Sequence, residues 1–282
     1  MTEEVQQPEK KKKRGEMIVV CSAKGGVGKT TLTVNLAVAL RKKNIKIGVL
    51  DGDFQFGDVG LALDLQSTFT MKDVVEEMDR LDAPTLNSYL CSHDSGVKVL
   101  PAPDRPEYAD LITEQSIEKV TELMLQDFDY LLVDTGAGIN EKSIQLLEKA
   151  DQIIVITNLE MATLKNTKLM LETLNILELS DKVQLVVNRS TMESVISAQD
   201  IPDILGIEEQ MLIPNDFQTA SQSLNIGIPF VTSQAKSDVA RSYFRIAEQL
   251  TSRREIAPIQ TKGPSVLSKL FGRKKEKEGS LT

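Results

Sequence analysis

The sequence predicts an α/β fold built on a doubly wound, mainly parallel β-sheet. Short apolar runs rich in Val and Ile alternate with segments of helical periodicity along the 282 residues. The runs are apolar almost throughout, which is typical of parallel strands that helices cover on both faces. Polar residues stand where several runs end, and ligands of such sheets bind beyond the carboxyl ends of the strands.

Six runs are interpreted as strands because each is short, apolar and rich in β-branched residues. In chain order the expected strands are residues 17–23, 45–51, 97–102, 128–134, 151–157 and 182–188. Between them, apolar residues recur at helical spacing, as Ile117, Val120 and Met124 do. The expected helices are residues 31–43, 113–127 and 161–179.

Charge and its distribution narrow the class of protein. The chain has 33 Lys and Arg against 41 Asp and Glu, a formal net charge of −8, which argues against a protein that coats nucleic acid with its whole surface. Basic residues gather near both ends. We expect one globular domain over residues 17–255, between a basic disordered tail, residues 1–16, and a linker with a short basic amphipathic segment, residues 256–282.

The remaining composition indicates a cytoplasmic protein. Cys21 and Cys91 are too far apart in sequence for a metal-site spacing, and His93 is the one histidine, so none of the three is assigned any chemistry. Nothing at the N-terminus resembles a secretory signal, and no apolar run approaches the roughly 20 residues that span a bilayer. Any membrane contact is therefore expected to be peripheral.

The stretch CSAKGGVGKTT joins the first predicted strand to the first predicted helix, as a phosphate-binding loop does. Gly25, Gly26 and Gly28 allow backbone angles that turn successive N–H groups toward phosphate oxygens at the helix N-terminus. Lys29 is expected to reach the β- and γ-phosphates of a nucleotide, and the Thr30 hydroxyl is expected to bind Mg²⁺.

Aspartates mark the ends of two other predicted strands. Asp51 and Asp53 follow the second strand, and Asp134 ends the fourth. A carboxylate at this edge can orient an attacking water or bind Mg²⁺ through water. A single aspartate at a strand end is also typical of a cap or turn, which is how we interpret Asp58. Three of them in one P-loop protein favour a nucleotide site.

The loop departs from the general P-loop pattern at Ala23, where that pattern has glycine, and it adds Lys24. In both features it resembles the deviant Walker A motif of the MinD/ParA superfamily. The resemblance implies an ATPase that uses ATP and Mg²⁺ and forms an ATP-dependent homodimer, in which Lys24 reaches the phosphates bound by the other subunit. The residues expected to contact the nucleotide here are Lys24, Gly25, Gly26, Val27, Gly28, Lys29, Thr30 and Thr31.

The same resemblance assigns roles to the acidic residues. Asp53 is the expected water-positioning residue, which makes Lys24 and Asp53 the catalytic candidates. The segment YLLVDTGAGI resembles the Walker B and switch II region, in which Gly136 and Gly138 let the backbone sense the γ-phosphate. The candidates for holding Mg²⁺ are Thr30, Asp51 and Asp134.

Adenine recognition and the dimer interface are also inferred from this resemblance. Asn188, at the end of the sixth predicted strand, and residues 213–216, which include Pro214, are expected to border the base, while Glu160 is expected near the interface. The alternative for each is a helix cap or a loop hydrogen bond.

Several segments are similar to one branch of the superfamily. DGDFQFGDVGLALDL, GVKVLPAPDRPEYADLIT and IPNDF resemble the CpaE/TadZ ATPases of tight-adherence pilus assembly, and the similarity extends over residues 17–250, approximately. DTGAGI is as much like FlhG, the regulator of flagellar number. A role in pilus assembly and a role in flagellar regulation therefore both remain possible interpretations of the sequence.

The C-terminal segment carries a pattern of its own. As a helix it places Val266, Leu267, Leu270 and Phe271 on one apolar face. This resembles the membrane-targeting sequence of MinD; the alternatives are a disordered basic tail or a last helix packed on the domain. Two weak copies in an ATP-bound dimer would bind a membrane together, so nucleotide would control occupancy. The basic residues around the face are Lys269, Arg273, Lys274 and Lys275.

The sequence thus predicts an ATP-dependent dimerising ATPase at the inner face of the cell membrane that positions or licenses assembly of a surface machine. A tight-adherence pilus is the first choice, with a pilus or flagellar assembly protein as partner. The alternatives are an FlhG-like regulator, a MinD-like division-site ATPase, a non-hydrolysing ATP-bound scaffold and a ParA-type DNA-segregation ATPase. The acidic body disfavours specific nucleic-acid binding, although the basic tails can bind DNA without sequence preference.

Overall fold

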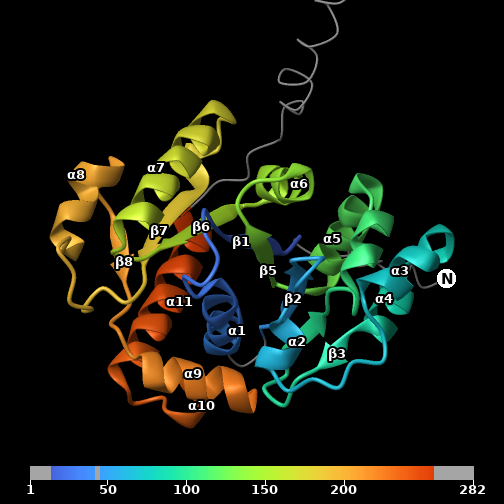
Figure 1. The fold of residues 1–282 in the computed structure, drawn as a ribbon. Helices are drawn as coiled ribbons and strands as arrows, with labels where there is room; N and C mark the ends of the chain where they lie inside the picture. The colour runs from blue at the N-terminus through green and yellow to red at the C-terminus, as the bar shows by residue number, and fades with distance from the viewer. Residues whose placement is uncertain (1–13, 42–44, 257–282) are drawn as a thin grey trace, which may run out of the picture.

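The predicted sheet is present in the computed structural model, which describes residues 14–41 and 45–256 (Figure 1). Eight strands lie in the order β3–β4–β2–β5–β1–β6–β7–β8. β3 pairs with β4 in antiparallel orientation, and the other neighbouring strands pair in parallel. The strands are β1 (Glu16–Ser22), β2 (Ile47–Gly52), β3 (Cys91–Ser92), β4 (Lys98–Leu100), β5 (Tyr130–Ala137), β6 (Gln152–Thr157), β7 (Val183–Val187) and β8 (Gln210–Leu212).

The three predicted helices are α1, α5 and α7, each with bounds close to those expected. Of the predicted tails, residues 1–16 and 256–282, the structure describes residues 14–16, where Glu16 begins β1, and Ile256 at the end of α11; the rest lie outside the described residues. The helices are α1 (Lys29–Leu40), α2 (Val59–Ala62), α3 (Met71–Glu76), α4 (Ala83–Tyr89), α5 (Glu114–Asp127), α6 (Glu141–Lys149), α7 (Met161–Ile176), α8 (Ile201–Leu205), α9 (Phe217–Ile226), α10 (Phe230–Ser233) and α11 (Asp238–Ile256).

Strand positions differ from the prediction in two respects. β3 and β8 were not predicted, because they have two and three residues, too few for an apolar run to be recognised. β5 extends to Ala137, so Asp134 lies inside the strand rather than at its end. The extension forms because β5 lies between β1 and β2, which supply hydrogen-bond partners on both sides as far as Ser22 and Gly52.

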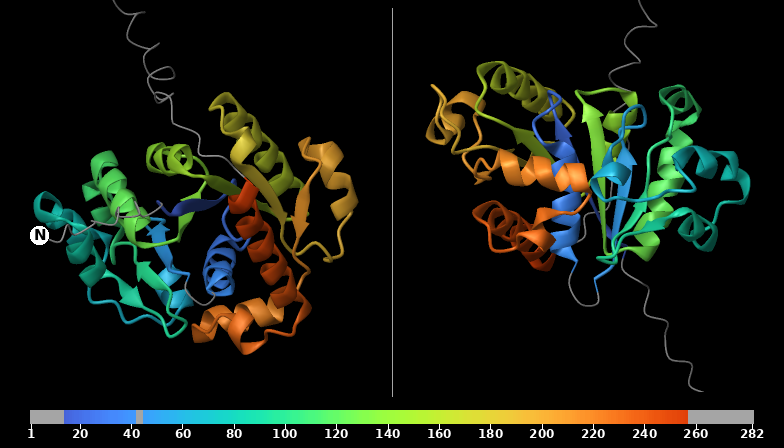
Figure 2. Two further views of the ribbon diagram at one scale, coloured as in Figure 1. Left: turned by 180° about the vertical axis from the view of Figure 1, so that it is seen from behind. Right: turned by 60° about the horizontal axis from the view of Figure 1, so that its bottom comes forward.

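The sheet separates two hydrophobic clusters, because successive side chains of a strand point to opposite faces. In β1, Met17 and Val19 pack in the cluster with α5, α6 and α7, whereas Ile18 and Val20 pack in the cluster with α1 and α11. Figures 1 and 2 show these two groups of helices on opposite faces of the sheet. The doubly wound architecture is therefore confirmed.

α1 lies between the sheet and α11, which explains its composition. Nine of its twelve residues are buried, including Thr33 and Asn35. The buried polar groups are satisfied within the fold: the Asn35 amide donates to the carbonyl oxygen of Thr31 (3.0 Å) and accepts from the backbone N–H of Val231 (3.2 Å). α1 is thereby held in place directly after the phosphate-binding loop.

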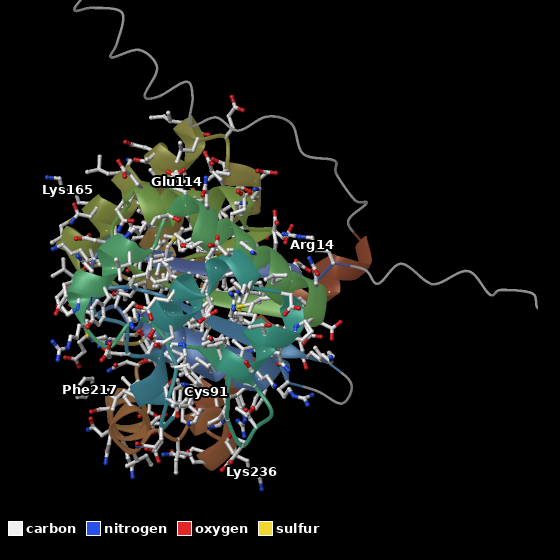
Figure 3. The ribbon with its side chains drawn as sticks, turned by 90° about the vertical axis from the view of Figure 1, so that its right-hand side faces the viewer. Arg14, Cys91, Glu114, Lys165, Phe217 and Lys236 are labelled. Carbon is white, nitrogen blue, oxygen red and sulfur yellow. The ribbon has the colours of Figure 1, made fainter. Side chains whose placement is uncertain are left out.

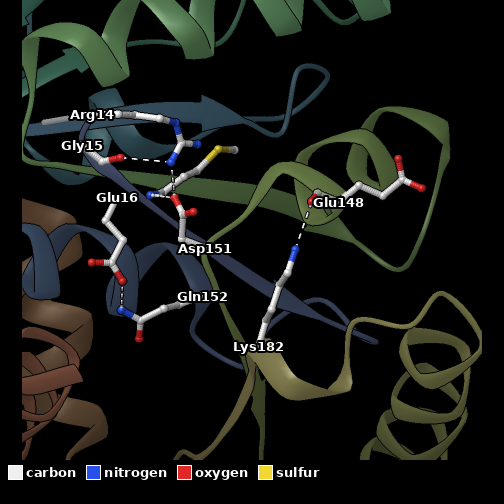
Figure 4. Close-up of polar contacts among 8 residues, drawn as sticks. Arg14, Gly15, Glu16, Glu148, Asp151, Gln152 and Lys182 are labelled. Carbon is white, nitrogen blue, oxygen red and sulfur yellow. Dashed lines mark hydrogen bonds and ion pairs between the residues drawn. The ribbon is translucent and has the colours of Figure 1, made fainter. Parts of the chain in front are cut away.

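Polar contacts fix the start of β1 against β6 (Figure 4). The Arg14 guanidinium donates to the Asp151 carboxylate (2.7 Å), which also accepts from the backbone N–H of Met17 (2.8 Å). Beside this pair, the Gln152 amide donates to the Glu16 carboxylate. These contacts lie at the amino ends of the parallel strands.

Candidate nucleotide site

The loop from β1 to α1 has the backbone that the glycine pattern predicts. Gly26 and Gly28 have φ values of +76° and +101°, in the left-handed region that L side chains rarely adopt. Gly28 is also the N-cap of α1, and a Cβ atom there would lie 2.6 Å from Nδ2 of Asn188. The loop therefore needs glycine at position 28 for both conformation and space.

Asn188 lies directly after β7 and braces this loop from 161 residues away. Its Nδ2 donates to the carbonyl oxygen of Val27 (2.8 Å), and its Oδ1 accepts from the backbone N–H of Arg189 (2.9 Å). From the sequence, Asn188 is expected at the adenine base. The structure places it next to the phosphate-binding loop, and contact with the base remains a prediction.

A cavity of about 660 Å³ lies among the residues that follow β7 and β8 and contains the predicted Pro214 in its wall. Ser190 and Thr191 line one side of it, and α11 lines the other through residues that include Arg241 and Phe244. The α11 residues were not predicted, because no spacing in the sequence connects them with the loops after β7 and β8. The cavity is large enough for a nucleobase.

Thr30 and Asp134 meet although 104 residues separate them. The Thr30 hydroxyl donates to Oδ2 of Asp134 (2.6 Å), and the Thr33 hydroxyl, which the sequence analysis did not include, donates to Oδ1 (3.1 Å). Burial raises the pKa of Asp134 to about 6, opposed by the Thr30 hydrogen bond and the charge of Lys29. A hydroxyl and a carboxylate are oxygen ligands of the kind that Mg²⁺ prefers, so these residues fit the predicted metal.

Lys29 brings positive charge to the same point. Its charge lowers the pKa of Asp134 and also that of Cys21, against a larger effect of burial that raises the pKa of the Cys21 thiol to about 12. The thiol is therefore protonated at neutral pH and chemically inert. The site thus offers phosphates a cation, loop N–H groups and a helix N-terminus.

The loop after β2, which carries Asp53, lies against the end of β5, which carries Gly136. Asp53 is partly exposed, and its Oδ1 accepts from the backbone N–H of Phe56 (3.2 Å). A Cβ atom at Gly136 would lie 3.4 Å from the Asp53 carboxylate. The structure therefore places the predicted water-positioning residue against the predicted switch II segment.

Lys24 differs from Lys29 in its surroundings. Its side chain is exposed, while the Ser22 hydroxyl donates to its backbone carbonyl oxygen (2.7 Å). The loop is thus fixed at a point from which Lys24 projects outward. Glu160, expected near an interface, is also exposed, directly before α7.

The Asp51 carboxylate, unlike that of Asp53, is buried and bonded to the backbone of its own loop. The Asp51 side chain is 1% exposed, and its two oxygens accept from the backbone N–H groups of Asp53 (3.3 Å) and Val59 (3.1 Å). A Cβ atom at Gly57 would lie 2.3 Å from the Asp51 carboxylate, so the loop closes tightly around it. Burial, followed by the charge of Asp134, raises the pKa of Asp51 well above its ordinary value. This geometry makes Asp51 an anchor of the loop that carries Asp53.

The anchor role predicts the outcome of Asp51→Ala. The change leaves two loop N–H groups without their acceptor, so we expect the free energy of unfolding to fall by about 2 kcal/mol and ATPase activity to fall with it. The Mg²⁺ concentration for half-maximal activity should stay unchanged. Asp58→Ala is the control, because the Asp58 side chain is exposed and makes no capping hydrogen bond. A shifted Mg²⁺ dependence in Asp51→Ala would instead support the metal-holding role predicted from the sequence.

Similar proteins identify the family. The septum site-determining protein MinD of Synechocystis sp. is 30% identical over 243 residues, which are 83% of this chain and 88% of that protein. A ParA family model, described as NUBPL iron-transfer P-loop NTPase, matches residues 13–251. The chain belongs to the MinD/ParA family of P-loop ATPases.

Solved structures of this family share the fold. MinD of Pyrococcus horikoshii OT3, complexed with Mg-ADP, has a TM-score of 0.75 at 24% identity and covers 87% of this chain and 100% of its own. The MinC:MinD complex of Aquifex aeolicus gives a TM-score of 0.72 at 26% identity, covering 88% and 100%. The fold prediction is confirmed, and so is an ATPase that uses ATP and Mg²⁺. None of the helices within residues 14–41 and 45–256 is long and apolar enough to cross a membrane.

Proposed function

We propose that this MinD/ParA-family ATPase dimerises with ATP and positions or licenses the assembly of a cell-surface machine, with a tight-adherence pilus as the first choice. The proposal rests on the different surroundings of two lysines in one loop. Lys29 lies beside Asp134, whereas Lys24 projects into solvent from a loop of fixed conformation. A phosphate site within one subunit gives a role to Lys29 but leaves Lys24 without one.

The residues brought together by the fold have the following roles in the proposed reaction. The loop N–H groups and Lys29 bind the phosphates of ATP. Thr30 and Asp134 hold Mg²⁺, which offsets the phosphate charge when it is bound. Asp53 orients the water that attacks the γ-phosphate. It is suited to this role because it is partly exposed and faces the backbone of Gly136.

The charge that develops on the transferred phosphoryl group requires a further cation. In the proposed dimer, Lys24 of one subunit supplies it to the ATP of the other, as an arginine finger does. Exposed apolar side chains adjoin the site, which favours an interface there: Phe56, three residues after Asp53, is 72% exposed, and Met161, directly after Glu160, is 66% exposed. Hydrolysis would then depend on dimerisation.

The choice of machine rests on the resemblance of residues 17–250 to the CpaE/TadZ branch. A MinD-like role at the division site is the second candidate, because the Synechocystis relative is a septum site-determining protein. An FlhG-like role is the third. Deleting the gene and scoring pili, flagella and septum placement by electron microscopy distinguishes them. Loss of pili with normal septa supports the first choice, and misplaced septa with normal pili overturn it.

Membrane association is proposed to follow the nucleotide state through the segment at residues 264–282, which lies outside the described residues. We expect the full chain to sediment with anionic vesicles in the presence of ATP and to remain in the supernatant with ADP, because two segments bind together in the dimer. Phe271→Glu places a charge on the apolar face and should abolish sedimentation while ATPase activity persists. Ser280→Glu, outside that face, is the matched control.

The same experiment separates this proposal from DNA segregation. DNA retention is measured in parallel, with and without ATP and at two salt concentrations, since binding through basic tails weakens steeply with salt. Vesicle sedimentation that survives Phe271→Glu would remove the C-terminal segment from the mechanism. ATP-dependent DNA retention without vesicle binding would favour the segregation function. A one-domain boundary at residues 17–255, with separate tails, is part of the same proposal.

A further inference from the structure

Thr33 contacts the Asp134 carboxylate but has no role in the proposed reaction. It lies one turn after Thr30 on α1, and residues three apart on a helix are neighbours on one face. Both hydroxyls reach the same carboxylate on β5: Thr30 donates to Oδ2 of Asp134 (2.6 Å), and Thr33 donates to Oδ1 (3.1 Å). In the part of the chain that the structure describes, these are the two side-chain donors to Asp134.

The orientation of the Asp134 carboxylate depends on these two donors. The torsion that turns a carboxylate about its Cβ–Cγ bond is soft, so rotamer preference alone does not fix it. The side chain is 1% exposed, so solvent has little access to replace a lost donor. Asp51, the register partner of Asp134 on β2, is bonded instead to the backbone of its own loop.

The Thr33 hydroxyl has two acceptors within reach. It lies 3.1 Å from the carbonyl oxygen of Lys29, four residues earlier, and 3.1 Å from Oδ1 of Asp134. The first contact is the local bond that a threonine inside a helix commonly makes. A hydroxyl carries one proton, so it cannot donate fully to both acceptors. The carboxylate is the stronger acceptor, because hydrogen bonds to a charged group are shorter and stronger than those between neutral groups.

We propose that Thr33 is a positioning residue for Mg²⁺ that acts through Asp134. Its hydroxyl holds Oδ1 and thereby keeps Oδ2 directed to Thr30, the other residue proposed to hold the metal. The inference therefore rests on the proposed Mg²⁺ site. Without the Thr33 hydroxyl, Thr30 would be left as a single donor, and the carboxylate could turn away from the orientation in which the two metal candidates meet.

Nucleotide binding with and without Mg²⁺ tests the inference in the full chain. A fluorescent ADP analogue is titrated at increasing Mg²⁺ concentrations and, separately, in EDTA. Thr33→Val keeps the shape of the side chain and removes its hydroxyl. We expect it to raise the Mg²⁺ concentration for half-maximal enhancement of binding about tenfold, because loss of a hydrogen bond that orients a metal ligand typically weakens metal binding by about 10–100-fold. Affinity in EDTA should equal that of the wild type, and Thr33→Ser, which keeps the hydroxyl, should show the wild-type Mg²⁺ requirement.

Thr121→Val is the matched control. Thr121 is a buried threonine of α5, and its hydroxyl donates to the helix carbonyl oxygens of Ile117 (2.8 Å) and Glu118 (2.9 Å) rather than to a carboxylate. Its loss removes a local helix bond of the kind that Thr33 also makes. The Mg²⁺ requirement of this variant should therefore equal that of the wild type. Circular dichroism verifies that each variant is folded.

The outcomes separate a positioning role from a merely structural one. An unchanged Mg²⁺ requirement in Thr33→Val, or an equal loss of affinity with Mg²⁺ and in EDTA, would overturn the inference. A Thr33→Ser protein as impaired as Thr33→Val would do the same, because the hydroxyl would then not be the decisive group. Thr30→Val tests the metal site itself. A raised requirement in Thr30→Val alone rejects only the role of Thr33, whereas no change in either variant rejects the proposed Mg²⁺ site as well.

Discussion

Lys29→Ala is expected to weaken ATP binding about 100-fold or more while the protein stays folded. Lys29 follows Gly28 at the start of α1, close enough to Asp134 for its charge to lower the pKa of that carboxyl group. Removing the ammonium group leaves the phosphates with the loop N–H groups but without the principal cation. Titration with a fluorescent ATP analogue measures the loss, and circular dichroism verifies the fold.

Lys165→Ala is the matched control for this prediction. Lys165 lies on α7 at the surface (Figure 3), and losing an exposed lysine costs little. Its ATP affinity should equal that of the wild type. If Lys29→Ala retained wild-type affinity, the phosphate contacts would lie elsewhere and the assignment of the loop would be wrong.

Lys24→Ala is expected to bind ATP but to lose both ATP-dependent dimerisation and hydrolysis, the latter by a factor of about 10³ or more. The Lys24 side chain is exposed, and the loop is held at this residue by its backbone carbonyl oxygen, which accepts from the Ser22 hydroxyl. Removing the side chain should therefore leave the fold unchanged. In the proposed dimer, two triphosphates would face each other, and loss of the lysines would leave their repulsion without compensation. Size-exclusion chromatography with ATP and phosphate release measure the two effects.

Mixing two inactive variants decides whether Lys24 acts across the interface. Asp53→Ala should bind ATP and accumulate as a dimer, because the phosphate contacts persist while the water is no longer oriented. In a mixed dimer, the Lys24→Ala subunit keeps its own Asp53 and receives Lys24 from the Asp53→Ala subunit. One of the two sites is then complete, so mixing should restore activity. If Lys24 acted within its own subunit, both sites would be incomplete and mixing would restore nothing.

Local features of the sequence predicted the greater part of the phosphate site. Gly26, Gly28, Lys29 and Thr30 lie within five consecutive residues, and a loop between a strand and a helix has few conformations that leave its N–H groups together. Local features of the sequence also predicted the buried parallel strands, because nearly continuous apolar runs indicate burial on both faces. Family membership followed from the same short stretch, through Lys24.

Other features depended on which strands became neighbours. Asp134 was expected at a strand end, but pairing with both β1 and β2 extends β5 past it. Thr33 joined Thr30 on the Asp134 carboxylate because one turn of α1 packs over β5. Asp51 and Asp53 are two residues apart and of the same residue type, yet one is buried on loop N–H groups and the other faces the site.

The sequence by itself therefore determined the fold class, the phosphate-binding loop and the identity of its two lysines, since these depend on local periodicity and on adjacent residues. The tertiary structure alone decided that Asn188 braces the loop at Val27 and that residues of α11 line one cavity together with Ser190 and Pro214. The physical reason is that hydrogen-bond partners and cavity walls come from distant segments, and only the crossover connections determine which of these segments meet.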